Sequence, residues 1–432
     1  MYTHVIWDWN GTIISDLHVC FSVINGLLTS RGLPSLTPER YHEVFNFPVE
    51  AYYEQAGFDF SRDPYPVLAR EFMEQYVPAS LDCGMTPGAL CALRYFRAVG
   101  AKQIILTASD TDTLAAQMDR LGVTGYFDAV LGQDNIYARG KAEIARDFIA
   151  RSGLDPRKML MIGDTLHDRE IAGVLGCDCV LIARGHHSAE RLRTGGCPVY
   201  SSLFAMLRAM EGETDACIFD LDGTVLNTLE DIAAAVNVTR RHFGLPEADT
   251  ETVRRTVGHG ARQLMEDMLP GHAEEALPVY REAYDAGLIV RTAPYRGVPE
   301  MLASLQKMGI TVGLHSNKPD HQSRRLAEHF YKGVFGYVSG KREGVAPKPD
   351  PVGTLAAAAG LGADPARTAF VGDSEVDVAS ARNAGMRPLS VTWGFRSADD
   401  LLRAGARLLF DAPEELAAYL GDESGLPDPF KE

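Results

Sequence analysis

Short apolar runs alternate with amphipathic stretches along this chain, and the same order of patterns occurs twice. The first half contains the runs THVIWD, KQIILTAS, KMLMIGD and CVLIARG, and the second contains ACIFD, ITVGLHSN, RTAFVGD and PLSVTWG. Each run has the length and composition of a buried strand. Helical patterns at 88–99 and 298–308 are each followed by a glycine, a common helix terminator. Strands that alternate with helices predict an α/β fold with parallel, doubly wound, Rossmann-like sheets.

The two halves align at a nearly constant spacing, which indicates an internal duplication. Asp8 falls on Asp220, 212 residues later, and Gly185 falls on Gly394, 209 residues later. A repeat of this length predicts independent tandem domains rather than the stacked units of a solenoid. The expected domains are residues 1–212 and 213–432, joined near the charged stretch RAMEGETDA.

A long, mostly helical segment separates the first and second predicted strands of each half, at about 16–82 and 228–293. Such segments are too long to be loops. We expect each to form a helical cap over the carboxyl edge of its sheet, where ligands of such folds bind.

Composition and charge narrow the class of function. The chain is 46% hydrophobic and carries a net charge of -16, from 42 basic and 58 acidic residues. This balance disfavours nucleic acid and anionic membrane surfaces as partners. Seven scattered cysteines indicate reduced thiols, and the sequence shows neither an apolar run long enough to span a membrane nor a signal-peptide pattern. We therefore expect a cytoplasmic protein without a membrane partner; the sequence does not indicate its oligomeric state.

Polar residues follow successive predicted strands in the second half. An Asp-Gly pair after a strand can mark a simple turn, but four such sites in order predict convergence at one sheet edge. A carboxylate can attack phosphorus, a second carboxyl can protonate the leaving oxygen, and carboxylates also hold Mg2+. Serine and lysine can hold the charge of the transferring group. The residues are Asp220 and Asp222 in DLDGT, Ser316, Lys348, and Asp373 and Asp377 in GDSEVD.

Through these motifs, residues 214–425 resemble a haloacid dehalogenase superfamily phosphatase, and the stretches FDLDGTVLNT, TVGHGARQLM, SNKPD and VTWGFRSADDL resemble phosphoglycolate phosphatases in particular. The resemblance implies Mg2+ as cofactor and an aspartyl-phosphate intermediate. It implies the following roles: Asp220 as nucleophile and metal ligand, Asp222 as general acid/base with a metal-binding carbonyl, Ser316 and Lys348 as phosphoryl binders, and Asp373 and Asp377 at the metal. The expected substrate-binding residues are Gly223, Thr224, Asn317 and His259, although the turn that contains His259 is equally explained as a glycine-rich cap turn.

The first half retains most of this pattern with one departure. Asn10 replaces the acid/base carboxyl, and an amide has no proton to transfer near neutral pH. General acid/base help is typically worth about 10²- to 10⁴-fold in rate. Asp8 aligns with the nucleophile, and Thr107 and Lys141 align with the phosphoryl binders, with Ser109 as a possible substitute for Thr107. The aligned metal ligands are Asp8, Asn10 through its backbone carbonyl, Asp164 and Asp168.

Three interpretations of the first half stay open: a slow or specialised phosphatase, a phosphate-binding regulatory domain, or a structural remnant. The motifs WDWNGT, FPVEAYYEQAGFDF and GDTLHD resemble uncharacterised superfamily members that share the Asp-to-Asn change, which assigns no activity. Nearby, we expect Trp7 and Trp9 to pack in the core and His186 and His187 to lie in a solvated loop.

The leading hypothesis is a Mg2+-dependent phosphatase acting on a small phosphorylated metabolite, with phosphoglycolate as the first substrate to test. Alternative enzymes are a phosphomutase or a hydrolase of pyrophosphate, sugar phosphates or nucleotides. The alternative without catalysis is a sensor or scaffold that binds a phosphorylated ligand.

Overall fold

Each half of the chain forms its own compact unit in the computed structural model, which describes residues 2–133 and 141–431. The first unit contains the chain up to Leu207 together with the segment from Leu426 onward, and the second contains Arg208–Gly425. The boundary at residue 212 and the cap limits given by the sequence stay predictions.

The first unit contains six strands and ten helices among its described residues. The strands are β1 (His4–Trp7), β2 (Lys102–Asp110), β3 (Ala129–Gln133), β4 (Met159–Gly163), β5 (Asp178–Ile182) and β6 (Val199–Tyr200). The helices are α1 (Leu17–Ser30), α2 (Pro38–Val44), α3 (Val49–Ala56), α4 (Tyr65–Ser80), α5 (Ala89–Ala98), α6 (Thr111–Arg120), α7 (Lys141–Ser152), α8 (Leu166–Leu175), α9 (Ala189–Arg193) and α10 (Leu203–Glu211), the last of which continues into the second unit.

The second unit repeats this order. Its strands are β7 (Ala216–Phe219), β8 (Leu226–Asn227), β9 (Ala293–Pro294), β10 (Thr311–Pro319), β11 (Tyr337–Lys341), β12 (Thr368–Gly372), β13 (Arg387–Val391) and β14 (Leu408–Phe410). Its helices are α11 (Leu229–His242), α12 (Thr250–Thr256), α13 (Ala261–Met268), α14 (Ala273–Ala286), α15 (Val298–Lys307), α16 (Asp320–Phe330), α17 (Pro351–Leu361), α18 (Glu375–Asn383), α19 (Ala398–Arg403) and α20 (Pro413–Leu420).

The two main sheets have the same topology. The strand orders are β3-β2-β1-β4-β5-β6 and β11-β10-β7-β12-β13-β14, and neighbouring strands are parallel. Helices cover both faces, so central strands such as Met159–Gly163 are buried along their whole length and have continuous apolar sequences. The α/β, doubly wound prediction is confirmed. The sequence analysis missed the edge strands β3, β6, β11 and β14, which are short or less apolar.

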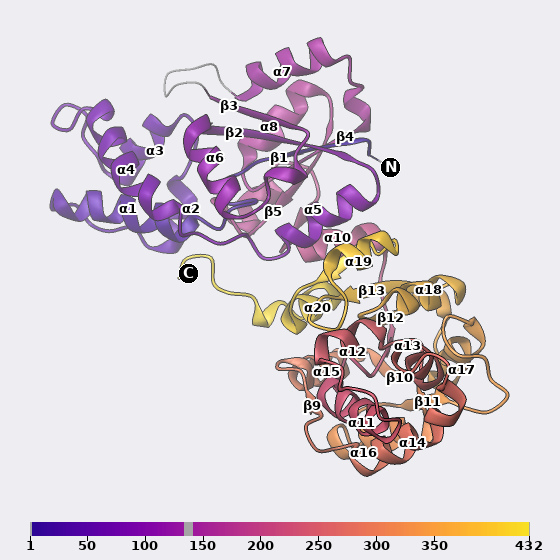
Figure 1. The fold of residues 1–432 in the computed structure, drawn as a ribbon. Coiled ribbons are helices and arrows are strands. Elements are labelled where there is room, and N and C mark those ends of the chain that lie inside the picture. The colour runs from indigo at the N-terminus through magenta and orange to yellow at the C-terminus, as the bar shows by residue number, and fades with distance from the viewer. Residues whose placement is uncertain (1, 134–140, 432) are drawn as a thin grey trace. The chain divides into compact units, whose positions relative to one another are not determined.

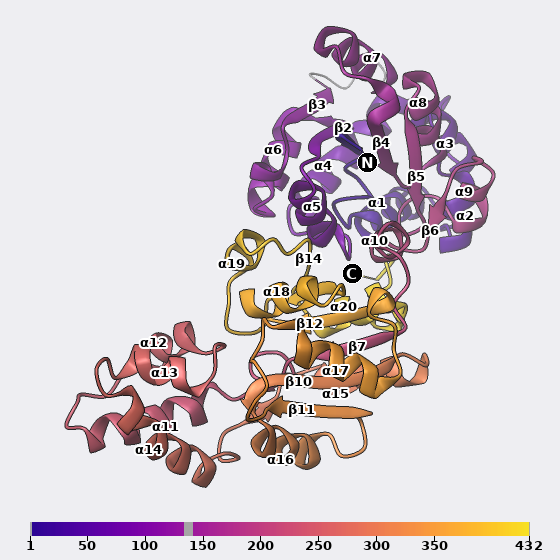
Figure 2. The same ribbon diagram turned by 90° about the vertical axis from the view of Figure 1, so that its right-hand side faces the viewer.

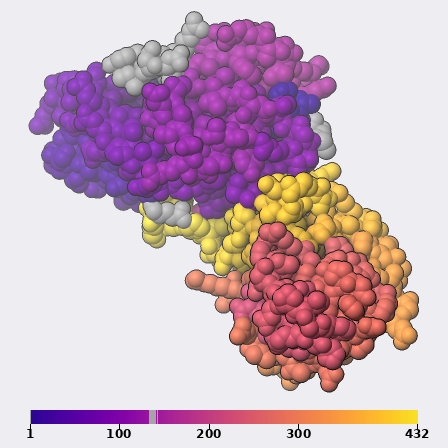
Figure 3. All heavy atoms as spheres, in the orientation of Figure 1, coloured from indigo at the N-terminus to yellow at the C-terminus, as the bar shows by residue number. Residues whose placement is uncertain are grey.

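A helical layer follows the first strand of each unit. We call α1–α4 the first cap and α11–α14 the second cap. The first cap lies to one side of the sheet of its unit in Figure 1, and the second cap does so in Figure 2. In Figure 3, atoms coloured red to salmon, which include the second cap, form most of the face that their unit turns to the viewer. No helix in the described part of the chain is long and apolar enough to cross a membrane.

The C-terminal segment from Leu426 onward packs on the first cap. The Phe430 ring lies 5.1 Å from that of Phe21 and 4.9 Å from that of His42, both in edge-to-face geometry. Arg184 donates a hydrogen bond to the carbonyl of Pro427. The apolar core of the first cap therefore includes a side chain that follows the whole second unit in sequence.

Candidate active site

The sheet topology brings the predicted residues of the second unit to one edge. Strand β7 lies between β10 and β12, so Asp220, which follows β7, is flanked by Ser316 at the end of β10 and Asp373 after β12. Gly223 turns the chain here with a φ of 83°. A Cβ at this glycine would lie 2.3 Å from Asp373 Oδ2, so the turn passes too close to the carboxylate for any side chain.

A buried lysine joins two carboxylates at this edge. Lys348 Nζ lies 2.8 Å from Asp220 Oδ1 and 2.7 Å from Asp377 Oδ1. Asp377 also accepts hydrogen bonds from the backbone N–H and the hydroxyl of Ser374, which caps helix α18. Because both carboxylates and the amine are almost fully buried, the ammonium is held at one defined point beside the nucleophile candidate.

Three carboxylates of this edge crowd together and suit a divalent cation. Oxygens of Asp220, Asp373 and Asp377 all lie within 4.8 Å of one another. Burial raises the pKa of Asp373 to about 8, and the charges of Asp377 and Asp220 add to the shift. Burial also raises the pKa of Asp220 to about 6, with Lys348 opposing the shift. Three carboxylates share one lysine here, so the all-oxygen donor set keeps excess negative charge and fits Mg2+.

Two residues that the sequence analysis did not assign hold the second carboxylate of the DLDGT motif. Lys318 Nζ lies 2.8 Å and 3.0 Å from the two oxygens of Asp222, and the Thr228 hydroxyl donates to Oδ1 at 2.6 Å. The ammonium also sits 4.5 Å above the ring of Tyr284 in the second cap. Lys318 stands in the quoted stretch SNKPD, so its position directly after the serine and asparagine was the available signal.

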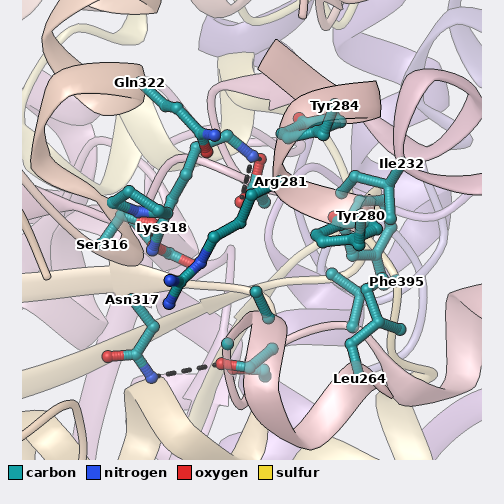
Figure 4. Close-up of a pocket in the computed structure, with 18 of the residues that line it drawn as sticks. Ile232, Leu264, Tyr280, Arg281, Tyr284, Ser316, Asn317, Lys318, Gln322 and Phe395 are labelled. Atoms are coloured by element: carbon teal, nitrogen blue, oxygen red, sulfur yellow. Dashed lines mark hydrogen bonds and ion pairs between the residues drawn. The ribbon is translucent and has the colours of Figure 1, made fainter. Parts of the chain in front are cut away.

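A pocket between the second cap and the sheet edge opens onto these residues (Figure 4). Ile232, Leu264 and Phe395 form an apolar side, and Arg281 of α14 extends into the pocket. Within the described part of the chain, the Arg281 side chain has neither a hydrogen bond nor an ion pair. Because Arg281 and Asp220 line the same pocket, this exposed guanidinium is available for an anionic group of a ligand there.

The predicted substrate-binding residues have different positions. Asn317 lines the pocket, where its amide accepts from the Lys348 N–H at 2.7 Å and donates to the Gly258 carbonyl of the cap at 3.2 Å. Thr224 instead donates to Asp373 Oδ1 at 2.9 Å, behind the pocket. His259 does not line the pocket; its ring lies 3.8 Å from the Glu375 carboxylate. Thr224 therefore supports the carboxylate cluster.

The first unit has the same buried cluster. Lys141 Nζ lies 2.6 Å from Asp8 Oδ1 and 3.6 Å from Asp168 Oδ1, and the carboxylate oxygens of Asp8, Asp164 and Asp168 lie within 4.8 Å of one another. Burial and the charge of Asp168 raise the pKa of Asp8 to about 8 and that of Asp164 to about 7. This donor set fits Mg2+ as well as that of the second unit does.

The direction of hydrogen bonding around Asn10 is reversed on one side relative to Asp222, which only accepts. Asn10 Nδ2 donates to Asp16 Oδ2 at 2.8 Å and to the Tyr76 hydroxyl at 2.7 Å. Its Oδ1 accepts from Ser109 at 2.8 Å and, over a longer 3.4 Å, from Thr107. Under the duplication, Asp16 takes the place of Thr228 and Ser109 the place of Lys318. The amide therefore belongs to a rebuilt network in which its donors and acceptors all have partners.

The prediction of a solvated loop at His186 and His187 is wrong. Both residues are buried, with 4% and 1% exposure. His187 Nδ1 accepts from the Leu166 N–H at 3.1 Å, so its Nε2–H donates to the cap carbonyl of Phe45 at 3.1 Å. Burial lowers the pKa of His187 to about 3, which keeps this neutral bridge between core and cap intact. Trp7 and Trp9 are fully buried in the core, as predicted.

Comparisons with known proteins agree with this architecture. The family model for haloacid dehalogenase-like hydrolases matches residues 5–182 and 217–391, two segments that start 212 and end 209 residues apart. The chain is 36% identical over 217 residues to an N-acetylmuramic acid 6-phosphate phosphatase of Pseudomonas aeruginosa, covering 48% of this chain and 94% of the relative. It is 33% identical over 224 residues to phosphoglycolate phosphatase 1 of the same species, covering 49% and 82%.

A solved structure of a haloacid dehalogenase-like hydrolase from Streptococcus pneumoniae matches at 25% identity with a TM-score of 0.45, covering 48% of this chain and 98% of that one. The family match covers most of the present chain and falls on both units. The chain therefore belongs to the haloacid dehalogenase-like hydrolase family, with two copies of the family domain in tandem.

Proposed function

We propose that the second unit is a Mg2+-dependent phosphatase that hydrolyses a small phosphorylated metabolite through an aspartyl-phosphate at Asp220. The carrying observation is that Asp220, Asp222 and Ser316 line one capped pocket, while the buried Lys348 Nζ lies 2.8 Å from Asp220 Oδ1. It is also supported by the phosphatase names of the similar relatives. Asp220, Asp373, Asp377 and the backbone carbonyl of Asp222 would hold Mg2+, which supplies positive charge against the phosphoryl oxygens when bound.

The reaction divides between the two carboxylates of DLDGT. A carboxylate oxygen of Asp220 attacks phosphorus, and the bond to the leaving oxygen breaks as Asp222 gives that oxygen its proton. Asp222 then takes a proton from water, whose oxygen attacks the aspartyl-phosphate and releases inorganic phosphate. Lys348 and the Ser316 hydroxyl hold the phosphoryl oxygens through both steps.

Lys318 and Thr228 position Asp222 for these proton transfers. Together they fix both carboxylate oxygens, at distances of 2.6 to 3.0 Å. Without them the carboxyl could rotate away from the leaving oxygen, and proton transfer depends on hydrogen-bond reach.

Arg281 supports a substrate that carries a second anionic group. Its side chain extends from the cap into the pocket that Ser316 and Asn317 also line (Figure 4). A carboxylate a few bonds from the phosphate could reach it and form a charge-assisted, bidentate pair. Phosphoglycolate has these two groups and is the first substrate to test.

For the first unit, we propose a metal- and phosphate-binding domain whose turnover is reduced because Asn10 cannot transfer a proton. Its intact lysine and carboxylates favour binding over a purely structural role. We also propose that the functional domains are residues 1–212 and 213–432, with the segment from Leu426 onward packed in the first unit. Their caps are about 16–82 and 228–293, and the protein is cytoplasmic.

The test is phosphate release with Mg2+ from phosphoglycolate and from ethyl phosphate, which lacks the second anion. Asp220→Asn should abolish release, whereas Asp8→Asn should leave most of it. Arg281→Leu should lower kcat/KM for phosphoglycolate by about 10- to 100-fold and leave ethyl phosphate unchanged. Loss of activity only in Asp8→Asn would overturn the assignment of the working site.

The same assay distinguishes the alternatives. A requirement for a sugar bisphosphate would indicate a phosphomutase, which uses the same residues but must exclude water. Preferred release from pyrophosphate, sugar phosphates or nucleotides would indicate another hydrolase of the family. Ligand binding without release of phosphate would indicate a sensor or scaffold.

A further inference from the structure

Three positions beside the Asp8 loop carry potential metal ligands in the first unit and none in the second. The positions correspond in structure as well as in sequence, because helices α1 and α11 begin 212 residues apart. Likewise, the His186 N–H donates to Asp164 as the Phe395 N–H donates to Asp373, at 2.6 and 2.7 Å. The pairs are Asp16 with Thr228, Cys20 with Ile232, and His186 with Phe395.

These three side chains converge although they come from distant parts of the chain. Asp16 precedes α1, Cys20 lies in its first turn, and His186 follows β5. Their ligand atoms lie within 4.8 Å of one another. Cys20 Sγ lies 3.8 Å from Asp16 Oδ2, close to the separation of about 3.6 Å that tetrahedral Zn2+ gives a thiolate and a carboxylate oxygen.

Asp16 is oriented by neighbours and still has room for a metal. Its Oδ1 accepts from the Gly11 N–H at 2.8 Å, and its Oδ2 accepts from Asn10 Nδ2 at 2.8 Å and from the Tyr76 hydroxyl at 2.6 Å. A carboxylate has about four lone-pair positions; Oδ2 also faces the Cys20 thiol, so the position that is left for a metal is on Oδ1. Donors that fix a carboxylate in this way are typical of the surroundings of metal ligands.

His186 presents one nitrogen without a partner. Tyr41 occupies Nδ1 at 2.9 Å, and the ring stacks on Phe45 at 4.3 Å between centroids. No hydrogen bond to Nε2 occurs among the residues that the structure describes. The bond to Tyr41 at the other nitrogen is the second contact that metal-bound histidines usually make.

We propose that Asp16, Cys20 and His186 form a binding site for Zn2+ or a similar thiophilic divalent cation in the first unit. The mixed sulfur, nitrogen and oxygen donors distinguish it from the all-oxygen cluster of Asp8, which suits Mg2+. Three protein ligands leave a fourth position for water or a ligand, as in catalytic zinc sites.

Binding replaces the thiol proton of Cys20. The thiol donates to the Asp16 carboxylate in the structure. A thiolate is the metal-binding form of cysteine, so the cation would take the place of the proton on sulfur and one proton would be released for each ion bound. The bound ion would link the beginning of the first cap to the core loop at His186.

The site also changes what the first unit can bind. In the second unit, Ile232 and Phe395 form part of the apolar side of the pocket. A cation with an open coordination position in the corresponding place would favour a ligand with an anionic or nitrogen donor there. The two units would then differ in substrate as well as in proton transfer.

The test uses the full-length protein, stripped with a chelator and titrated with Co2+ in the presence of excess Mg2+. We expect one Co2+ per chain, intense visible bands of tetrahedral Co2+ and a near-ultraviolet sulfur-to-cobalt charge-transfer band, all displaced by Zn2+. Because this signature is measured on the wild-type protein, the test does not depend on any variant folding. Absence of the charge-transfer band would overturn the proposal.

Each variant replaces a proposed ligand with the residue that stands at the corresponding position of the second unit. Cys20→Ile should abolish the charge-transfer band, and His186→Phe should weaken Co2+ binding by at least about tenfold. Cys179→Ala, which alters another buried thiol of the same unit, should change neither. Circular dichroism shows whether each variant folds. A band that persists in Cys20→Ile, or that is lost in Cys179→Ala, would contradict the assignment.

Discussion

Replacing Asn10 with aspartate should destabilise the first unit rather than restore an active site. The new carboxylate oxygen would lie where the amide nitrogen now donates to Asp16 Oδ2 over 2.8 Å. Two carboxylates at that separation, one buried and one half-buried, cannot both be ionised, so one must keep a proton. The replacement would also lose the hydrogen bond that the amide gives to Tyr76.

The loss in free energy of unfolding cannot exceed the free energy needed to keep one of the two carboxyls protonated. An aspartyl carboxyl with an ordinary pKa of about 3.9 costs about 1.4 kcal/mol for each pH unit above that value. The loss should therefore be about 4 kcal/mol at pH 7 and about 1.5 kcal/mol at pH 5. The sign follows because a carboxyl whose pKa is raised only in the folded state binds more protons there, so stability falls as pH rises above about 4.

Fluorescence-monitored urea unfolding can measure this loss in the first unit alone. Trp7 and Trp9 are both buried there, and the remaining tryptophan of the chain is Trp393 in the second unit. A Trp393→Phe background therefore confines the signal to the first unit. Each variant is compared with this background in the same chelator-containing buffer at pH 5 and pH 7.

The matched control is Asn10→Asp combined with Asp16→Asn, which exchanges the carboxylate and the amide. This exchange restores one donor opposite one acceptor and should recover most of the lost stability at pH 7. Equal stability of the single variant and the background at pH 7 would refute the reasoning. So would a double variant that is no more stable than the single one.

Four further results are expected. Gly223→Ala should lower phosphatase kcat by at least about 100-fold, because a Cβ would lie 2.3 Å from Asp373 Oδ2; near-normal turnover would contradict this close approach. Lys318→Met should lower kcat by about tenfold or more with little change in KM, because it frees Asp222 to rotate; a change in KM alone would argue for substrate binding instead. In chelator, thermal stability should fall as the pH rises from about 4 to 8, because Asp373, with its pKa of about 8, keeps a proton that the unfolded chain has lost. Mg2+ should make this dependence on pH weaker. A stability that does not change with pH in chelator would count against the buried carboxylate cluster. Phe430→Ala should destabilise the first unit by about 1–2 kcal/mol in the tryptophan assay, and no effect would show that its contacts with the first cap are dispensable.

The sequence predicts the residues whose positions follow from strand order. Asp220, Ser316 and Asp373 each stand at the end of a strongly apolar strand, and parallel strands place such ends at one edge. The duplication adds a second, independent indication, because the same spacing recurs with Asp8 and Asp164. The local hydrophobic pattern and the internal repeat together are sufficient to predict the doubly wound fold and the cluster of carboxylates.

The residues that the sequence analysis missed depend on packing between distant segments. Lys318 acquires its position only when the second cap places Tyr284 beside it. His186 follows a glycine after a strand, a typical setting for a solvated loop, yet Phe45 and Tyr41 of the first cap cover it. No local pattern shows which cap side chain will lie over which loop.

The segment that carries Phe430 makes the two units unequal in topology. The chain enters the first unit, leaves it at Leu207, builds the whole second unit and then returns. The second unit is in this sense an insertion into the first. During synthesis the first cap cannot gain its last aromatic contact until the second unit has been made. A proteolytic cut between Gly425 and Phe430 would leave Phe430 without a covalent link to the unit whose cap it packs on.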